Sequence, residues 1–210
     1  LTKLQPDAVE AWQILIRQQL RDRSALKAAL DSAQRANAAN PDNGPLLELL
    51  GQVQLAMGDA NQALSTFNKM AAVMPQSAQP LVLVADAHLA NKDKPAALQA
   101  IKKALALQPD HPRALETFVG LELESGQTKE VMDIARKLQS TKATQLRGLA
   151  LEADVESWRK NWDGAVAVYR KALELQPASA FAIKLHRNLL AAKRDGEARQ
   201  FSTNWQSRYP

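Results

Sequence analysis

The histidines are the side chains of this sequence best suited to acid–base or metal chemistry, and they stand far apart. His88, His111 and His186 lack a second histidine or a carboxylate at metal-ligand spacing, and the pattern H-E-x-x-H is absent. Glu122 and Glu124 lie two residues apart, so on a helix their carboxylates point in different directions. These residues predict neither a catalytic dyad nor a metal centre.

Other catalytic signatures are also absent. The chain has no cysteine, which excludes disulfides, thiolate catalysis and cysteine-ligated zinc. It contains no glycine-rich phosphate loop, no G-x-S-x-G motif and no dinucleotide fingerprint. We therefore expect a protein that is not an enzyme and that uses no cofactor and no small-molecule substrate.

Composition favours helix, and the charge is uneven. Of the 210 residues, 46% are hydrophobic and 23% are charged, with alanine and leucine dominant over β-branched residues. Residues 1–40 carry six basic against four acidic residues, and residues 184–210 carry six against two, whereas the long middle segment is nearly balanced. The net charge of +5 therefore comes from the two ends. A continuous basic stripe is missing, which disfavours nucleic acid as the partner.

Prolines recur at a regular interval. Successive spacings are close to 34 residues, with one proline replaced by Ala143, and the series reads Pro6, Pro41, Pro75, Pro109, Pro177 and Pro210. Proline ends a helix because it lacks the backbone N–H. The period predicts a single array of helix pairs with repeats at about 8–43, 44–77, 78–111, 112–145, 146–177 and 178–210. One extra residue in the first repeat is expected near Arg23 and Ser24.

The positions inside each repeat carry a family signature. The second repeat places Leu50-Gly51, Ala63, Phe67 and Pro75 at the expected spacing, and the fifth places Leu149, Ala153, Ala165, Tyr169 and Pro177 there. Over essentially its whole length the chain resembles the tetratricopeptide repeat (TPR) family. The fourth repeat departs from the pattern at Val131 and Ala143, and the sixth is displaced by about one residue. The resemblance implies an all-α fold, an α-solenoid forming a right-handed superhelix of about six helix-turn-helix units.

The resemblance also implies where a partner binds. In TPR arrays the first helix of each pair lines the concave face, and a protein, a peptide or a partner helix lies there. Carried onto this chain, the inner positions give Arg17, Gln52, Asp86, Arg113, Glu116, Arg147, Asp154, Trp158 and His186. Trp158 is either a ligand anchor or packs against Trp162. The side chains of the TPR clamp for chaperone tails are absent at the corresponding positions.

A second kind of surface is the basic last repeat. Lys193, Arg194 and Arg199 stand close together there. They favour an anionic polymer, a polysaccharide or nucleic acid, as the alternative partner.

The start of the sequence predicts a segment of a longer array. Residues 1–7 contain Leu4-Gln5-Pro6, which repeats Leu175-Gln176-Pro177, so they read as the tail of an earlier repeat. We expect this end to expose Trp12 and Leu15 and to self-associate. The repeat end Leu173-Glu174-Leu175-Gln176-Pro177 and the run Glu152-Ala153-Asp154 carry a second, looser resemblance. It is to bacterial TPR lipoproteins of PEP-CTERM/exosortase exopolysaccharide systems. That resemblance implies a periplasmic location with a lipid anchor outside this segment; the alternative is the cytoplasm.

Overall fold

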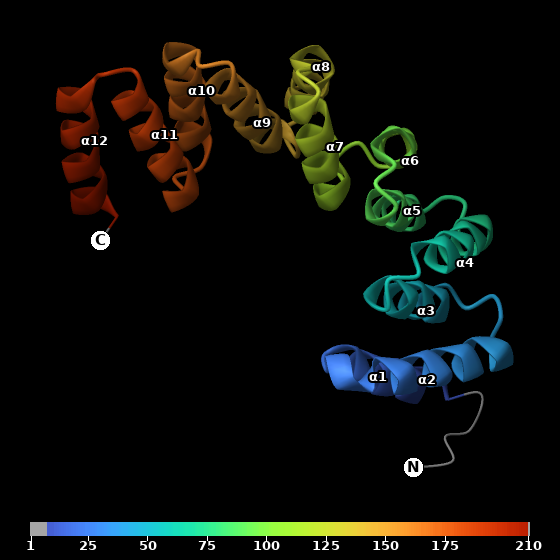
Figure 1. The fold of residues 1–210 in the computed structure, drawn as a ribbon. Helices are drawn as coiled ribbons and strands as arrows, with labels where there is room; N and C mark the ends of the chain where they lie inside the picture. The colour runs from blue at the N-terminus through green and yellow to red at the C-terminus, as the bar shows by residue number, and fades with distance from the viewer. Residues whose placement is uncertain (1–7, 210) are drawn as a thin grey trace. The chain divides into compact units, whose positions relative to one another are not determined.

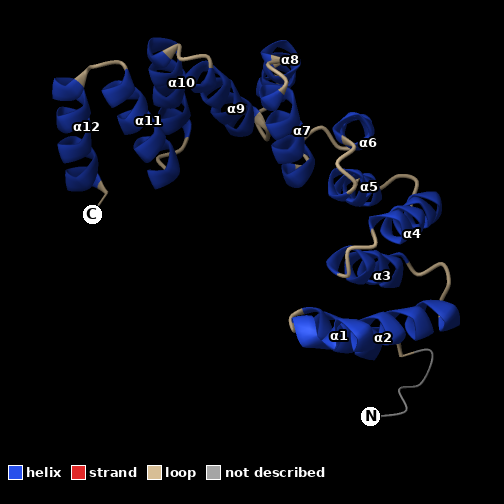
Figure 2. Ribbon diagram, in the orientation of Figure 1, coloured by secondary structure: helices blue, strands red, loops and turns tan. Residues whose placement is uncertain are grey.

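The regular secondary structure of the described residues consists of helices joined by loops and turns (Figures 1 and 2). The computed structural model describes residues 8–209, and the predicted tail of residues 1–7 lies outside them. The described residues form α1 Val9–Leu20, η1 Arg23–Ala25, α2 Leu26–Ala39, α3 Gly44–Ala56, α4 Ala60–Val73, α5 Gln79–Ala90, α6 Lys94–Leu107, α7 Pro112–Glu124, α8 Thr128–Gln139, α9 Gln145–Trp158, α10 Trp162–Leu175, α11 Ser179–Ala191 and α12 Asp195–Arg208. The predicted all-α solenoid is confirmed.

From the second helix pair onward, the turn inside each pair is built the same way. A residue with positive φ ends the first helix, at Gly58, Lys92, Gly126, Lys160 and Lys193. The next backbone N–H then donates to a carbonyl of the last helical turn, for example from Asp59 to Gln54 at 2.9 Å and from Asp93 to His88 at 2.8 Å. This Schellman-type closure satisfies carbonyls that the helix end leaves unpaired. It sends the chain back as an antiparallel second helix.

Side-chain caps then start several of the second helices. The carboxylate of Asp59 accepts from the backbone N–H of Gln62 at 3.0 Å, and that of Asp93 accepts from Ala96 at 3.1 Å. Asn161 caps α10 through its amide oxygen. Such caps satisfy N–H groups that have no partner within the helix. The local sequence therefore sets the start of these helices as well as the end of the preceding ones.

Small residues at the signature positions let the helices approach closely. Ala63, Ala97 and Ala165 are fully buried where the second helices cross the first. In the second repeat the first helix also carries Gly51, where an added Cβ would lie only 2.2 Å from the Phe67 ring. Phe67 is itself fully buried. The Phe67 ring therefore fits only because residue 51 has no side chain.

The chain divides into two compact units, Leu1–Phe118 and Val119–Pro210. In the first unit successive helices from α1 to α6 pack on one another, and the first helices α1, α3 and α5 also contact one another in series. In the second unit α8 packs on α9, α9 on α10, α10 on α11, and α11 on α12. In the part of the chain that the structure describes, no helix has the length and apolar character needed to cross a membrane.

The first repeat confirms one expectation and corrects another. The extra residue is absorbed by η1, whose start is capped by Asp22 through the backbone N–H of Ser24 at 2.9 Å. The expected exposure of Trp12 is wrong. Trp12 is only 4% exposed because it packs in a core formed by α1, α2 and α3, with the Arg35 guanidinium 5.5 Å from its ring centre. Leu15 is half-buried.

Candidate functional site

A cleft of 420 Å³ opens on the first helices of the first unit. Its lining comes from α1, α3, α5 and α7 alone, and no second helix contributes. The lining residues are Leu20, Gln52, Leu55, Leu83, Asp86, Leu89 and Arg113. Four leucines with a few polar groups is the composition typical of sites that bind peptides or small molecules. The cleft contains three of the sequence-predicted site residues, Gln52, Asp86 and Arg113.

A short amide network fixes the polar side chains next to the cleft. The carboxylate oxygen Oε1 of Glu48 accepts from the side-chain amides of Gln52 and Gln79, each at 3.1 Å. Glu48 and Gln52 belong to α3, and Gln79 begins α5. The network therefore joins successive repeats and orients Gln52 at the cleft wall.

Asp86 and Arg113 form an ion pair at the cleft. Nη2 of Arg113 lies 2.8 Å from Oδ2 of Asp86, whose side chain is 18% exposed whereas that of Arg113 is 53% exposed. No N–H meets Oδ2 with hydrogen-bond geometry, however. Burial raises the pKa of Asp86 above its ordinary value, and the Arg113 charge offsets only part of that rise. This carboxylate is incompletely stabilised in its ionised form.

Sequence reasoning missed the apolar half of this site. Leu20, Leu55 and Leu89 stand near the ends of α1, α3 and α5, and the last two are one repeat apart. The recurrence of leucine at this position in successive repeats is the sequence signal that could have identified them. The other predicted inner residues of this unit, Arg17 and Glu116, are exposed on α1 and α7 but do not line the cleft.

In the second unit Asp154 is at the centre of a polar cluster. Nζ of Lys184 lies 2.8 Å from both carboxylate oxygens of Asp154, and the Tyr169 hydroxyl donates a short hydrogen bond to Oδ1. Burial raises the pKa of the Tyr169 phenol, and the bond to Asp154 raises it further. The cluster ties α9, α10 and α11 together, so Asp154 is already satisfied from within the chain.

The remaining predicted residues of the second unit do not share a common set of contacts. Trp158 is 48% exposed at the end of α9, and among the described residues no ring contact joins it to Trp162. Arg147 is exposed near the start of the same helix. His186 is half-buried, with Nδ1 2.8 Å from the Ser202 hydroxyl and 3.2 Å from the Ala198 carbonyl. His186 therefore holds α11 to α12.

The basic patch is partly neutralised by neighbouring carboxylates. Arg194 donates to Asp163 at 2.7 Å and to Glu197 at 2.7 Å, and these bonds raise its pKa. Lys193 forms the positive-φ turn before α12, and Arg199 is exposed on that helix. Lys193 and Arg199 are thus the exposed cations of the predicted patch.

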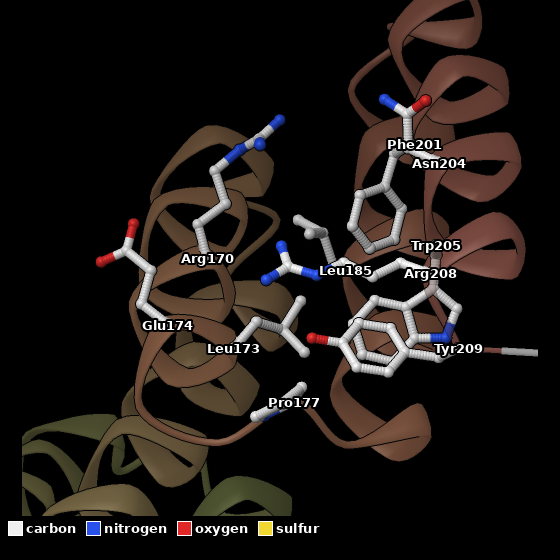
Figure 3. A pocket seen from close by; sticks show the side chains of 10 residues that line it. All are labelled: Arg170, Leu173, Glu174, Pro177, Leu185, Phe201, Asn204, Trp205, Arg208 and Tyr209. Atoms are coloured by element: carbon white, nitrogen blue, oxygen red, sulfur yellow. The ribbon is translucent and has the colours of Figure 1, made fainter.

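A second cavity, of 450 Å³, lies between α10, α11 and α12. One wall is a row of rings on α12 and the residue that follows it: the centroids of Phe201 and Trp205 are 6.0 Å apart, and those of Trp205 and Tyr209 are 4.4 Å apart. Leu173 lies opposite these rings (Figure 3). The Arg208 guanidinium stands 5.6 Å from the Tyr209 ring centre. None of the sequence-predicted site residues lines this cavity.

The histidines show no shared site. Nδ1 of His111 accepts from the backbone N–H of Ala114 at 3.2 Å and so caps α7, whereas Nδ1 of His88 lies 3.8 Å from Asp93. Within residues 8–209 no three metal-ligating side chains gather. Each histidine has a structural contact of its own.

These features define the class of the molecule. A 34-residue period, paired antiparallel helices, small residues at the helix crossings and a binding-type cleft on the first helices together describe a helical-repeat scaffold. No protein-family model and no curated protein sequence matches the chain.

Solved structures narrow the class to the tetratricopeptide-repeat fold. A TPR protein from Parabacteroides merdae is similar with a TM-score of 0.64 and 19% identity, over 94% of this chain and 80% of that one. PilF from Pseudomonas aeruginosa is similar with a TM-score of 0.63 and 16% identity, over 97% and 93%. MamA from Desulfovibrio magneticus is similar with a TM-score of 0.56 and 18% identity, over 78% and 93%. At identities this low the likeness establishes the fold.

Proposed function

We propose that this protein is a non-catalytic scaffold that binds a segment of a partner protein in the leucine-lined cleft on α1, α3, α5 and α7. The observation that carries the proposal is the lining itself, because every residue of it comes from a first helix. Binding faces built from corresponding positions of successive repeats are the usual product of solenoid architecture.

The size and chemistry of the cleft suit a peptide side chain. A volume of 420 Å³ accommodates one or two large apolar side chains together with the adjoining backbone. Burying a leucine or similar side chain contributes about 1.5–3 kcal/mol. Gln52, Asp86 and Arg113 then supply polar contacts that select among apolar segments. Specific binding of an extended or helical segment follows from the combination.

The test compares cleft leucines with an exposed leucine elsewhere in the same unit. Leu55→Ser and Leu89→Ser should each abolish capture of peptides selected on the intact chain. Leu107→Ser is the matched control, because Leu107 is 42% exposed on α6 and lies outside the cleft. Binding would be followed by fluorescence anisotropy, with circular dichroism to verify the fold. Equal losses in all three variants would contradict a site in the cleft.

The cellular setting is a separate proposal. The resemblance to bacterial TPR lipoproteins supports a role in exopolysaccharide or protein-sorting machinery, with the repeats in the periplasm. Fractionation of cells that express the full-length gene product tests this placement. Recovery of the protein in the cytoplasmic fraction would contradict it.

An anionic polymer at the basic end remains the rival proposal. It predicts that Lys193→Ala and Arg199→Ala weaken binding of a sulfated polysaccharide, with strong salt dependence. The cleft proposal predicts instead that these variants leave peptide binding unchanged.

A further inference from the structure

We propose that the bound segment presents a lysine ammonium to Asp86, with a neighbouring apolar side chain among the leucines of the cleft. This inference rests on the proposed function and adds the chemistry of the ligand. The second unit satisfies an aspartate with a lysine of its own, and the first unit has no lysine at the corresponding place.

Asp86 and Asp154 are the same position of two repeats. They lie 68 residues apart, which is two periods. The structure supports this register on both sides, because Ala85 and Ala153 are both fully buried and Lys92 and Lys160 both adopt the left-handed turn conformation. The two carboxylates therefore start from corresponding points on corresponding helices.

In the second unit two side chains satisfy the carboxylate. Lys184 places its ammonium 2.8 Å from both oxygens of Asp154. The Tyr169 hydroxyl, from the second helix of the same repeat, donates to Oδ1 as well. An aspartate at this position thus accepts an ammonium from the direction of the next first helix.

In the first unit neither partner is present. Ile101 stands where Tyr169 stands in the later repeat, and both are buried. On α7 the equivalent of Lys184 is Thr117. The neighbouring residues Phe118 and Leu185 are the matching buried positions, because Gly126 and Lys193 close the two helices at the same distance beyond them. Thr117 has neither the length nor the charge to replace the ammonium.

Arg113 compensates only in part. It approaches Asp86 from the first turn of α7, one turn before Thr117, and leaves Oδ2 without a hydrogen bond of standard geometry. Burial still raises the pKa of Asp86 in its presence. Glu116 is exposed three residues beyond Arg113, on the same side of α7. Asp86 thus keeps an oxygen with which a cationic ligand can pair.

The experiment begins with a peptide library panned on the intact chain. The most enriched peptide would be labelled and compared with a twin in which its lysine is replaced by norleucine, which keeps the apolar stem and removes the charge. We expect enriched sequences to carry lysine beside an apolar residue, and the twin to bind at least about tenfold more weakly. Binding of the lysine peptide should weaken as salt is raised.

Two variants test the role of Asp86 directly. Asp86→Asn should weaken the lysine peptide by about tenfold and leave the norleucine twin unchanged. Asp31→Asn is the control, because this carboxylate is 69% exposed in a surface pair with Arg35. Thr117→Lys recreates the arrangement of the second unit, so it should occupy Asp86 from within the chain and produce the same selective loss. Thermal unfolding of each variant verifies that it is folded.

The alternative results separate the two proposals. Enrichment of acidic peptides, with binding lost in Arg113→Ala, would overturn the lysine assignment and leave the cleft as the site. Equal affinity for the lysine peptide and its twin would do the same. Peptides that bind undiminished to Leu55→Ser and Leu89→Ser would contradict the proposed function itself.

Discussion

The two units differ in how they pair an aspartate at the same repeat position. In the second unit Asp154 receives hydrogen bonds from Tyr169 and Lys184 and joins three helices. In the first unit Asp86 has only the close approach of Arg113, at the edge of a leucine-lined cleft. The difference shows that position in the repeat does not decide how a side chain is paired. The residues that neighbouring helices bring to that position decide it.

The largest expected effect is a difference in stability between two variants that each remove one of these carboxylate charges. Asp154→Asn should lower the free energy of unfolding by about 1–2 kcal/mol, because it weakens charge-assisted hydrogen bonds to Tyr169 and Lys184. Asp86→Asn should change it by less than about 0.5 kcal/mol or raise it, because the lost ion pair is offset by removal of a desolvated charge.

Urea unfolding can follow this contrast unit by unit. Trp12 is the only tryptophan of the first unit, while Trp158, Trp162 and Trp205 report on the second. Trp12→Phe therefore leaves a fluorescence signal from the second unit alone. Equal destabilisation by Asp154→Asn and Asp86→Asn would remove the distinction drawn between the two carboxylates.

Parts of this picture were accessible from the sequence. The proline period and the family signature inside each repeat predicted an all-α array, since helix stops depend on local chemistry. The residues of the cleft were only half predictable. Leu55 and Leu89 resemble core leucines in sequence, and only the packing shows that they line an open surface. Trp12 was misjudged because α2 covers it.

The state of Asp86 was beyond sequence reasoning for a physical reason. It depends on Ile101 in the same repeat and on Arg113 and Thr117 in the next. A pattern of inner-face positions assigns each residue to a face but does not say which side chains meet across repeats. The pairing of Asp154 with Lys184 was missed for the same reason.

The two units should also differ in how their stability depends on pH. The folded-state pKa of Asp86 is raised above the ordinary 3.8, so between 3.8 and that raised value the folded chain binds more protons than the unfolded chain. Stability contributed by this group is therefore present at low pH and is lost as pH rises through the folded pKa. Asp86→Asn should remove this decline. Urea midpoints measured at closely spaced pH values provide the check, with Asp31→Asn as the control.

A pH profile unchanged by Asp86→Asn would mean that the carboxylate is as well stabilised as an exposed one. Asp86 would then have no electrostatic preference for a further cation. Ligand binding should run in the opposite direction, because the lysine peptide needs Asp86 ionised and should bind more tightly as pH rises through the same window.

The smallest expected effect concerns a feature that the two units share. Each unit closes helix pairs with left-handed residues of both kinds: Gly58 and Lys92 in the first, Gly126 and Lys160 in the second. A side chain in this conformation costs roughly 1 kcal/mol, and glycine avoids that cost. Lys92→Gly and Lys160→Gly should each raise the free energy of unfolding by about 0.5–1 kcal/mol, and Gly58→Ala and Gly126→Ala should lower it similarly. Because the turns are built alike, the two units should respond equally in urea titrations. An effect confined to one unit would show that the difference between them extends beyond the side chains around Asp86 and Asp154 to the turns that position every first helix.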